Sequence, residues 1–484
     1  MNNLKLKALS GLLWSFTEQF SMQIIMFVVS VVMARMLMPE EFGLIAMPTV
    51  FIAIGIALRD SGLSSSLIRT KNPTNRDYST VFYINIIFSV VTYAIVYFVA
   101  PYISDFYDKP ILINIIRLQA LTIVIGSITS IQHTRLTKAM NFKKQMNLQV
   151  LSVIVSAACG IGFAYYGYGV WSLVYMNIIQ YVIAAFNYWL ASSWRPEWIF
   201  DYNMAKKHLH FGYKLTLSGI LNVFYENFYT ILIGKFFGAS HLGFYTRAKS
   251  TQELPIKNIS AALNKVTYSL FSEIQDDNNK LKDVYAKIMQ QLLFWILPTM
   301  LIAATVAEPL FIFVFSEKWI SAVPYFQLLC FAGILAPLNM YNLNILNVKG
   351  RSDLYLIAEI INKGFIIGTS IVFIEYGIES LLYFQIIASI ISFLINSFIS
   401  GKVISFGPHE QLKNILPILA NGLIMGAVTW SSYHLIEGII VSDFFKVVII
   451  SMIGVSTYLL LGKVFRLEPL RELTELLTKR KALS

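Results

Sequence analysis

Long apolar stretches recur along the whole chain, and they constrain its fold more than any other feature. A helix needs about 20 apolar residues to cross the hydrocarbon core of a bilayer. We therefore predict an all-α integral membrane protein with about fourteen transmembrane helices, each boundary being set to within roughly 3 residues. The predicted spans are 12–37, 42–66, 79–100, 111–132, 147–166, 169–190, 213–237, 243–271, 288–315, 321–346, 354–374, 378–400, 415–436 and 444–463.

The composition excludes most other classes of protein. Of the 484 residues, 56% are hydrophobic and only 13% are charged, whereas a soluble domain carries about 25% charged residues to wet its surface. This excludes a soluble enzyme, a nucleic-acid-binding module and a disordered chain. The net charge of +11 is typical of a membrane protein whose cytoplasmic loops hold excess Lys and Arg.

The distribution of the basic residues predicts the orientation in the membrane. Loops on one side carry most of the 38 Lys and Arg residues, and the bias alternates from loop to loop. Because the basic side is the cytoplasmic side, both termini are predicted to be cytoplasmic. The opposite loops hold few basic residues: Arg35, Lys109, Lys235, Lys318 and Lys446.

A longer break at 191–212 divides the first six spans from the next six. We predict an N-lobe at 1–190, a cytoplasmic amphipathic connection at 191–212, a C-lobe at 213–400 and two further spans with a cytoplasmic amphipathic tail at 401–484. An ordinary polar loop is the alternative for the connection. His208 and His210 within it are interpreted as interfacial loop residues.

The two halves are weakly repeated. A shift of 200 residues aligns ARMLMPEEFGLI at 34–45 with GKFFGASHLGFY at 234–245, so that Gly43 meets Gly243. With six spans in each half, the halves have the same orientation, and this predicts a parallel repeat about an axis along the membrane normal.

Ionisable residues inside predicted spans are the candidates for function, because each is costly in the bilayer and normally faces a cavity or a partner. Arg59 and Asp60 are neighbours in span two and point about 100° apart, so they cannot simply pair with each other. Arg117 lies in span four. Glu359 and Lys363 are four residues apart, which favours an internal ion pair.

Span eight, at 243–271, carries a series of cations. Lys249, Lys257 and Lys265 are spaced by eight residues, and Arg247 precedes them. Each step rises about 12 Å and turns about 80°, which places the three lysines on one broad face. Pro255 is expected to break or kink this helix. We predict substrate-binding roles for Arg247, Lys249, Lys257 and Lys265, with Arg59 and Arg117 as weaker candidates.

Cations along a membrane path call for an anionic ligand. A lipid phosphate or pyrophosphate, an acidic sugar and an anionic solute all fit. The alternative is that 243–271 is a surface helix outside the membrane, but that would reverse the loop bias of every later span.

Two carboxylates, Glu226 in span seven and Glu18 in span one, are candidates for ion coupling. Desolvation and nearby cations act in opposite directions on a carboxyl group, so its protonation can follow the opening of a cavity. The alternative for Glu226 is a fixed ion pair with a cation of span eight.

Several segments resemble one family. FFGASHLGFYTRAKSTQELP at 236–255, IQDD at 274–277, PEEFGLIAM at 39–47 and RDSGLSSSLIR at 59–69 are similar to the Wzx-type flippases. These form the polysaccharide transporter branch of the multidrug/oligosaccharidyl-lipid/polysaccharide superfamily. The resemblance covers essentially the whole chain, including its length and number of spans.

The resemblance implies two six-helix lobes around a central cavity, plus two C-terminal helices. It also implies export of an undecaprenyl-pyrophosphate-linked glycan across the bacterial inner membrane by alternating access. Membrane lipids, a polysaccharide polymerase and glycosyltransferases are the implied partners. The alternatives are a MATE-like small-molecule antiporter and a membrane polysaccharide polymerase or ligase.

Motifs for catalysis are missing from the sequence. It contains no HExxH, GxSxG, P-loop or dinucleotide-binding glycine pattern, and its two cysteines, Cys159 and Cys330, lie in separate apolar runs. We therefore predict no enzyme activity, no metal and no cofactor.

Overall fold

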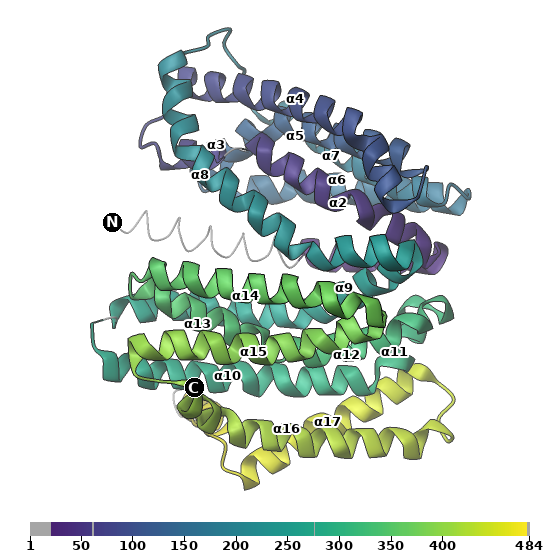
Figure 1. The fold of residues 1–484 in the computed structure, drawn as a ribbon, viewed down its shortest axis with the longest axis vertical. Helices are drawn as coiled ribbons and strands as arrows, with labels where there is room; N and C mark the ends of the chain where they lie inside the picture. The colour runs from purple at the N-terminus through teal and green to yellow at the C-terminus, as the bar shows by residue number, and fades with distance from the viewer. Residues whose placement is uncertain (1–20, 61, 275, 482–484) are drawn as a thin grey trace. The chain divides into compact units, whose positions relative to one another are not determined.

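The computed structural model describes residues 21–60, 62–274 and 276–481, and every regular element within them is a helix. The chain divides into two compact units, Met1–Gly243 and Phe244–Ser484 (Figure 1). The predicted all-α membrane architecture is confirmed.

In the first unit, α2, α4, α5, α6 and α7 pack side by side, and α8 lies against α2, α3 and α4 (Figure 1). A shorter apolar helix at Ser21–Met36 precedes them. The helices of this unit are α2 (Pro39–Asp60), α3 (Leu63–Arg69), α4 (Asn75–Tyr107), α5 (Leu112–Lys138), α6 (Phe142–Tyr165), α7 (Val170–Ala191), α8 (Tyr202–Glu226) and the beginning of α9 (Phe228–Glu273).

The connection between α7 and α8 docks on the beginning of α4. Trp194 is buried edge-on against Tyr78 and Phe82, and the backbone N–H of Glu197 donates to Ser79 Oγ at 3.0 Å. Helix α8 begins at Tyr202 and runs to Glu226 without interruption. The helical part of the predicted connection is therefore the first part of α8, rather than a separate short helix.

Two glycines related by the 200-residue repeat make equivalent backbone contacts within the first unit. A Cβ atom on Gly43 would lie 1.7 Å from the carbonyl oxygen of Ala239, and one on Gly243 would lie 1.9 Å from that of Pro39. No other residue type fits either position without moving the backbone. Because Pro39 and Ala239 are also related by the same shift, the contacts support the repeat.

The second unit is built around α10, which packs against α12, α13, α15, α16, α17 and α18. The unit contains the remainder of α9, α10 (Asn278–Thr305), α11 (Ala307–Phe315), η1 (Glu317–Ala322), α12 (Val323–Gly333), α13 (Ala336–Val348), α14 (Ser352–Phe373), η2 (Ile374–Tyr376), α15 (Ile378–Ile404), α16 (Pro408–Glu437), α17 (Asp443–Val464) and α18 (Glu468–Lys481).

The described residues contain eleven helical segments that are long and apolar enough to cross a membrane, so the number fourteen is not confirmed. Helices α8 and α9 are not among the eleven. Both are long, but α8 carries Lys206, Lys207 and His208 in its second turn, and α9 carries several charges in its middle. The interruption in α9 lies at Gly238, with φ 82° and ψ −177°, whereas Pro255 lies within a helical stretch.

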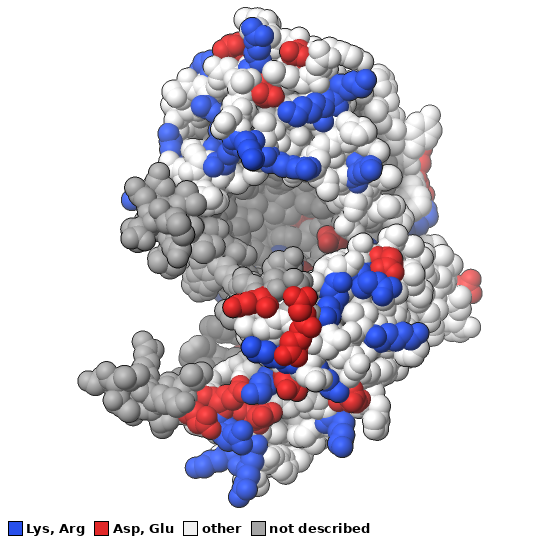
Figure 2. Space-filling view, turned by 90° about the vertical axis from the view of Figure 1, so that its left-hand side faces the viewer, with Lys and Arg blue, Asp and Glu red and all other residues white. Residues whose placement is uncertain are grey.

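Basic side chains gather at one end of the helices in the first unit, and Lys and Arg are prominent on the face that Figure 2 presents. They lie where α3 and α5 end, where α4 and α6 begin, and between α7 and the second turn of α8. The residues are Arg69, Lys71, Arg76, Lys138, Lys143, Lys144, Arg195, Lys206 and Lys207. This clustering agrees with the loop bias read from the sequence.

Candidate functional site

A polar cavity of about 510 Å³ lies within the first unit. It is lined by the end of α2, the beginning of α3 and parts of α5, α6 and α7. Its polar lining consists of Arg59, Asp60, Ser64, Thr129, Ser130, His133, Gln149, Asn177, Gln180, Tyr181 and Tyr188. Polar groups from several membrane helices thus meet at one place, where the bilayer would otherwise penalise each of them.

Arg59 is the Lys or Arg residue among the described residues that line this cavity, and Gly126 of α5 makes room for it. A Cβ atom on Gly126 would lie 2.3 Å from Arg59 Nη1. Asp60, next in sequence, accepts a hydrogen bond from Ser64 Oγ at 2.7 Å. Arg59 Nε is buried and has no hydrogen-bond partner among the described residues. Because the guanidinium of Arg59 lines the cavity, it can donate to an acceptor of a ligand there.

The predicted cations of α9 differ in their burial and in the groups that they contact. Arg247 is buried, and its guanidinium carbon lies 5.0 Å from the ring centre of Phe315 and 4.9 Å from that of Trp319. Lys257 Nζ lies 2.7 Å from Glu253 Oε2, and Lys249 Nζ lies 4.0 Å from Glu253 Oε1. The Lys257 side chain is 70% exposed. The carboxylate of Glu253 therefore lies between two of the predicted substrate-binding cations, Lys249 and Lys257.

The remaining predicted residues are spread over both units. Arg117 stacks on the ring of Tyr97, its guanidinium carbon 4.0 Å from the ring centre. Glu226 is an exposed residue at the end of α8, where the helical path breaks before α9 begins. Glu18 and the side chain of Lys265 lie outside the described residues.

The predicted internal pair of Glu359 and Lys363 is confirmed as an ion pair on α14. The spacing of four residues indicated it correctly, because such residues lie on one face of a helix.

The interpretation of His208 as an interfacial loop residue is wrong. His208 is fully buried in α8, with Nδ1 2.7 Å from Ser66 Oγ and Nε2 3.2 Å from Asp77 Oδ1. Ser, His and Asp side chains also form the catalytic triad of many hydrolases. Here all three side chains are buried between helices, so the group ties α8 to α3 and α4. The sequence gives no signal of it, because the residues are far apart in the chain.

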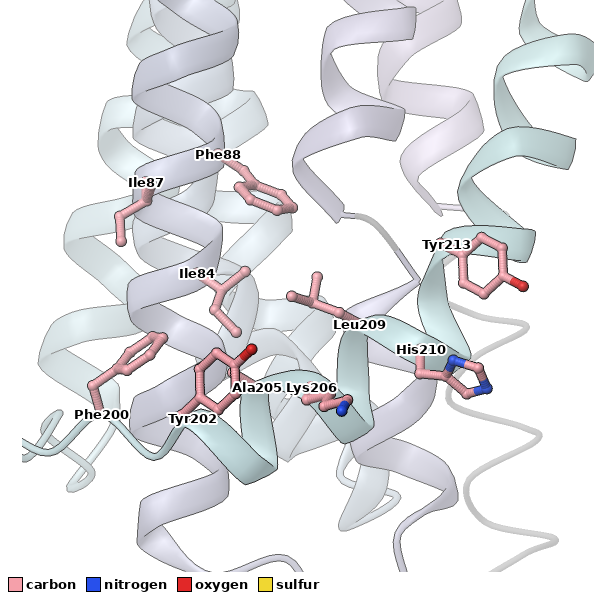
Figure 3. A pocket seen from close by; sticks show the side chains of 10 residues that line it. All are labelled: Ile84, Ile87, Phe88, Phe200, Tyr202, Ala205, Lys206, Leu209, His210 and Tyr213. Atoms are coloured by element: carbon pink, nitrogen blue, oxygen red, sulfur yellow. The ribbon is translucent and has the colours of Figure 1, made fainter.

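A second cavity, of about 520 Å³, is an apolar groove on the first unit. Figure 3 shows Ile84, Ile87 and Phe88 on α4 facing Phe200, Tyr202 and Leu209 across it. Lys206, His210 and Tyr213 complete the lining from α8. Apolar side chains with polar residues beside them are typical of a surface at the edge of a bilayer.

Bundles of apolar helices, with a polar cavity within the first unit, are typical of a multi-spanning membrane transporter. The solved structure of the lipid II flippase MurJ in an inward closed conformation has the same fold, with a TM-score of 0.75 and 17% identity, covering 94% of this chain and 98% of that one. An inward-facing MATE transporter matches with a TM-score of 0.59 and 16% identity, covering 79% and 94%.

The chain belongs to the family described as "Polysaccharide biosynthesis protein", which matches residues 32–324. The teichuronic acid biosynthesis protein TuaB of Bacillus subtilis (strain 168) is 27% identical over 90% of this chain and 91% of its own length. The lipopolysaccharide biosynthesis protein WzxC of Escherichia coli (strain K12) is 26% identical over 73% and 72%. The resemblance found in the sequence is confirmed.

Proposed function

We propose that this protein is a flippase that moves a lipid-pyrophosphate-linked oligosaccharide across the membrane for surface polysaccharide synthesis. The observation that carries the proposal is the combination of a flippase fold and polysaccharide family membership. We infer that the lipid is undecaprenyl pyrophosphate, that the membrane is the bacterial inner membrane and that transport uses alternating access. Separate glycosyltransferases would then act before this step, and a polymerase would act after it.

The direct test is reconstitution in liposomes with a fluorescent oligosaccharide linked to undecaprenyl pyrophosphate. We expect the protein to expose the glycan to an added glycosidase on the far side. Empty liposomes and liposomes with heat-denatured protein are the controls. Export of a cationic dye without movement of the glycan would instead favour a MATE-like antiporter, and elongation of the glycan would favour a polymerase.

For the pyrophosphate we propose Lys249, Lys257 and Lys265 of α9 as the attracting cations. Lys257 supports this proposal best, because its side chain is the most exposed of the α9 cations whose side chains are described. Arg247 packs on two rings and so positions this part of α9, while Arg117 is held on Tyr97. Lys257→Gln should slow flipping more than Lys257→Arg at equal protein levels, because a point charge and not a shape is required. Equal rates for the two variants would contradict the assignment.

Orientation and coupling remain parts of the proposal. With both termini cytoplasmic, Ser193→Cys should be closed to an impermeant reagent added outside, and Asp105→Cys should react with it; both positions are exposed. If Glu226 or Glu18 couples flipping to a proton or sodium gradient, Glu226→Gln or Glu18→Gln should abolish the gradient dependence while protein levels stay normal. Gradient dependence that survives in both variants would remove both residues from the mechanism.

A further inference from the structure

The cavity around Arg59 has a lining with little net charge. Among the described residues, Arg59 and Asp60 are the Lys, Arg, Asp or Glu residues that line it, and their charges cancel. The other polar groups are amides, hydroxyls and the ring of His133. We propose that this cavity binds a sugar unit of the transported glycan, and not its pyrophosphate. This inference rests on the proposed function and names the part of the substrate that the first unit recognises.

A pyrophosphate does not suit these residues. It carries at least two negative charges, and buried sites for such groups need several cations or backbone N–H donors. Here the described lining offers one guanidinium, and the carboxylate of Asp60 lines the same cavity. Without further cations, the desolvation of a multiply charged anion would not be offset.

A sugar suits them better. Each sugar hydroxyl donates and accepts, and so do the amides of Gln149, Asn177 and Gln180. Arg59 adds a guanidinium that lines the same cavity and carries further N–H donors. The volume of about 510 Å³ lies within the range of about 300–1,000 Å³ that is usual for small-molecule sites. Sites that bind hydroxyl groups in this way also discriminate strongly against ligands that lack them.

Protection of an engineered cysteine tests the inference by binding alone. Ala184 lines the cavity without contributing a polar side chain, so we choose the full-length Ala184→Cys variant in a background with Cys159→Ser and Cys330→Ala. The two probes are oligosaccharides released by mild acid from the host's lipid-linked pool and inorganic pyrophosphate. At four times its Kd the oligosaccharide should slow alkylation by a maleimide about fivefold, because the reactive fraction is 1/(1 + [L]/Kd). Pyrophosphate should leave the rate unchanged.

Slowing by pyrophosphate, or by neither probe, would overturn the inference. So would a lack of alkylation without ligand, because a cavity closed to a small reagent cannot admit a sugar. Added Asn177→Leu or Gln180→Leu should remove the protection, and the matched control Asn203→Leu, at an exposed position of α8, should keep it. Protection that persists in both cavity variants would also count against the site. Failure of the wild type to flip the lipid-linked glycan would contradict the proposed function; intact flipping without protection would contradict only this inference.

Discussion

Arg59 and Arg247 are both arginines in membrane helices, but their surroundings give them different tasks. Arg59 borders a polar cavity, where Gly126 leaves space for its guanidinium. Arg247 is buried against the rings of Phe315 and Trp319. The first arrangement places the guanidinium at a polar cavity, whereas the second packs it against aromatic rings. An intramembrane arginine is therefore a functional candidate only once its neighbours are known.

The largest effect should come from the Arg59 cavity. Arg59→Gln removes the guanidinium, and Gly126→Ala displaces it, because the added Cβ would lie 2.3 Å from Arg59 Nη1. A charged hydrogen bond contributes about 1.5–3 kcal/mol, so we expect either variant to slow flipping about ten- to a hundredfold. The measurement is the flipping rate in liposomes at equal protein content. Normal flipping by Gly126→Ala would show that the position of the guanidinium is unimportant.

A comparable loss of stability, without a specific loss of function, should follow from His208→Ala. The change leaves Ser66 and Asp77 without their bonds to the imidazole, and an unsatisfied buried polar group costs about 1–3 kcal/mol. We expect a lower thermal midpoint in detergent and less protein in the membrane. The flipping rate per folded molecule should stay close to that of the wild type. A lower rate per molecule with normal stability would assign His208 to transport instead.

Arg247→Gln should have a smaller effect, and the effect should again be on stability. A cation–π contact contributes about 0.5–2 kcal/mol, and Arg247 makes two of them. We expect a lower thermal midpoint, with a partial loss also in Arg247→Lys because an ammonium stacks less well on rings. Variants that unfold like the wild type but flip more slowly would place Arg247 with Arg59, and the contrast between the two arginines would fail.

The smallest effect on stability is expected for Lys257→Gln. Lys257 is exposed and paired with Glu253 on the same helix, and such pairs contribute about 0.2–1 kcal/mol. The thermal midpoint should be close to that of the wild type. Any slowing of flipping would then reflect the loss of the positive charge of Lys257. A large fall in the midpoint would mean that the Lys257–Glu253 pair holds the second unit together.

The sequence predicts local features well because they depend on neighbours along the chain. The apolar runs indicate the membrane helices, and the spacing of Glu359 and Lys363 indicates their ion pair. The Leu-rich tail forms α18 (Glu468–Lys481). Glu253 is four residues from both Lys249 and Lys257, so the sequence alone also indicates it as a partner for these two cations.

Contacts between distant helices were not available from the sequence. His208 meets Ser66 and Asp77 across more than 130 residues, and Gln149, Asn177 and Gln180 are ordinary polar residues of apolar spans until they meet at one cavity. The break in α9 was expected at Pro255 and lies at Gly238. A glycine has no side chain that opposes the left-handed conformation found there, and a proline within a helix can be accommodated by its neighbours.

The sequence by itself determined that this protein is a helical membrane protein, which end of its helices is basic and which family it belongs to, because hydropathy and local motifs are properties of the chain. Only the tertiary structure decided which buried charges are available to a ligand. Arg59 and Arg247 have the same chemistry and the same cost in a bilayer. Their roles differ because Gly126 lies next to the guanidinium of Arg59, whereas two aromatic rings lie next to that of Arg247. These neighbours are supplied by packing between helices that are far apart in the sequence.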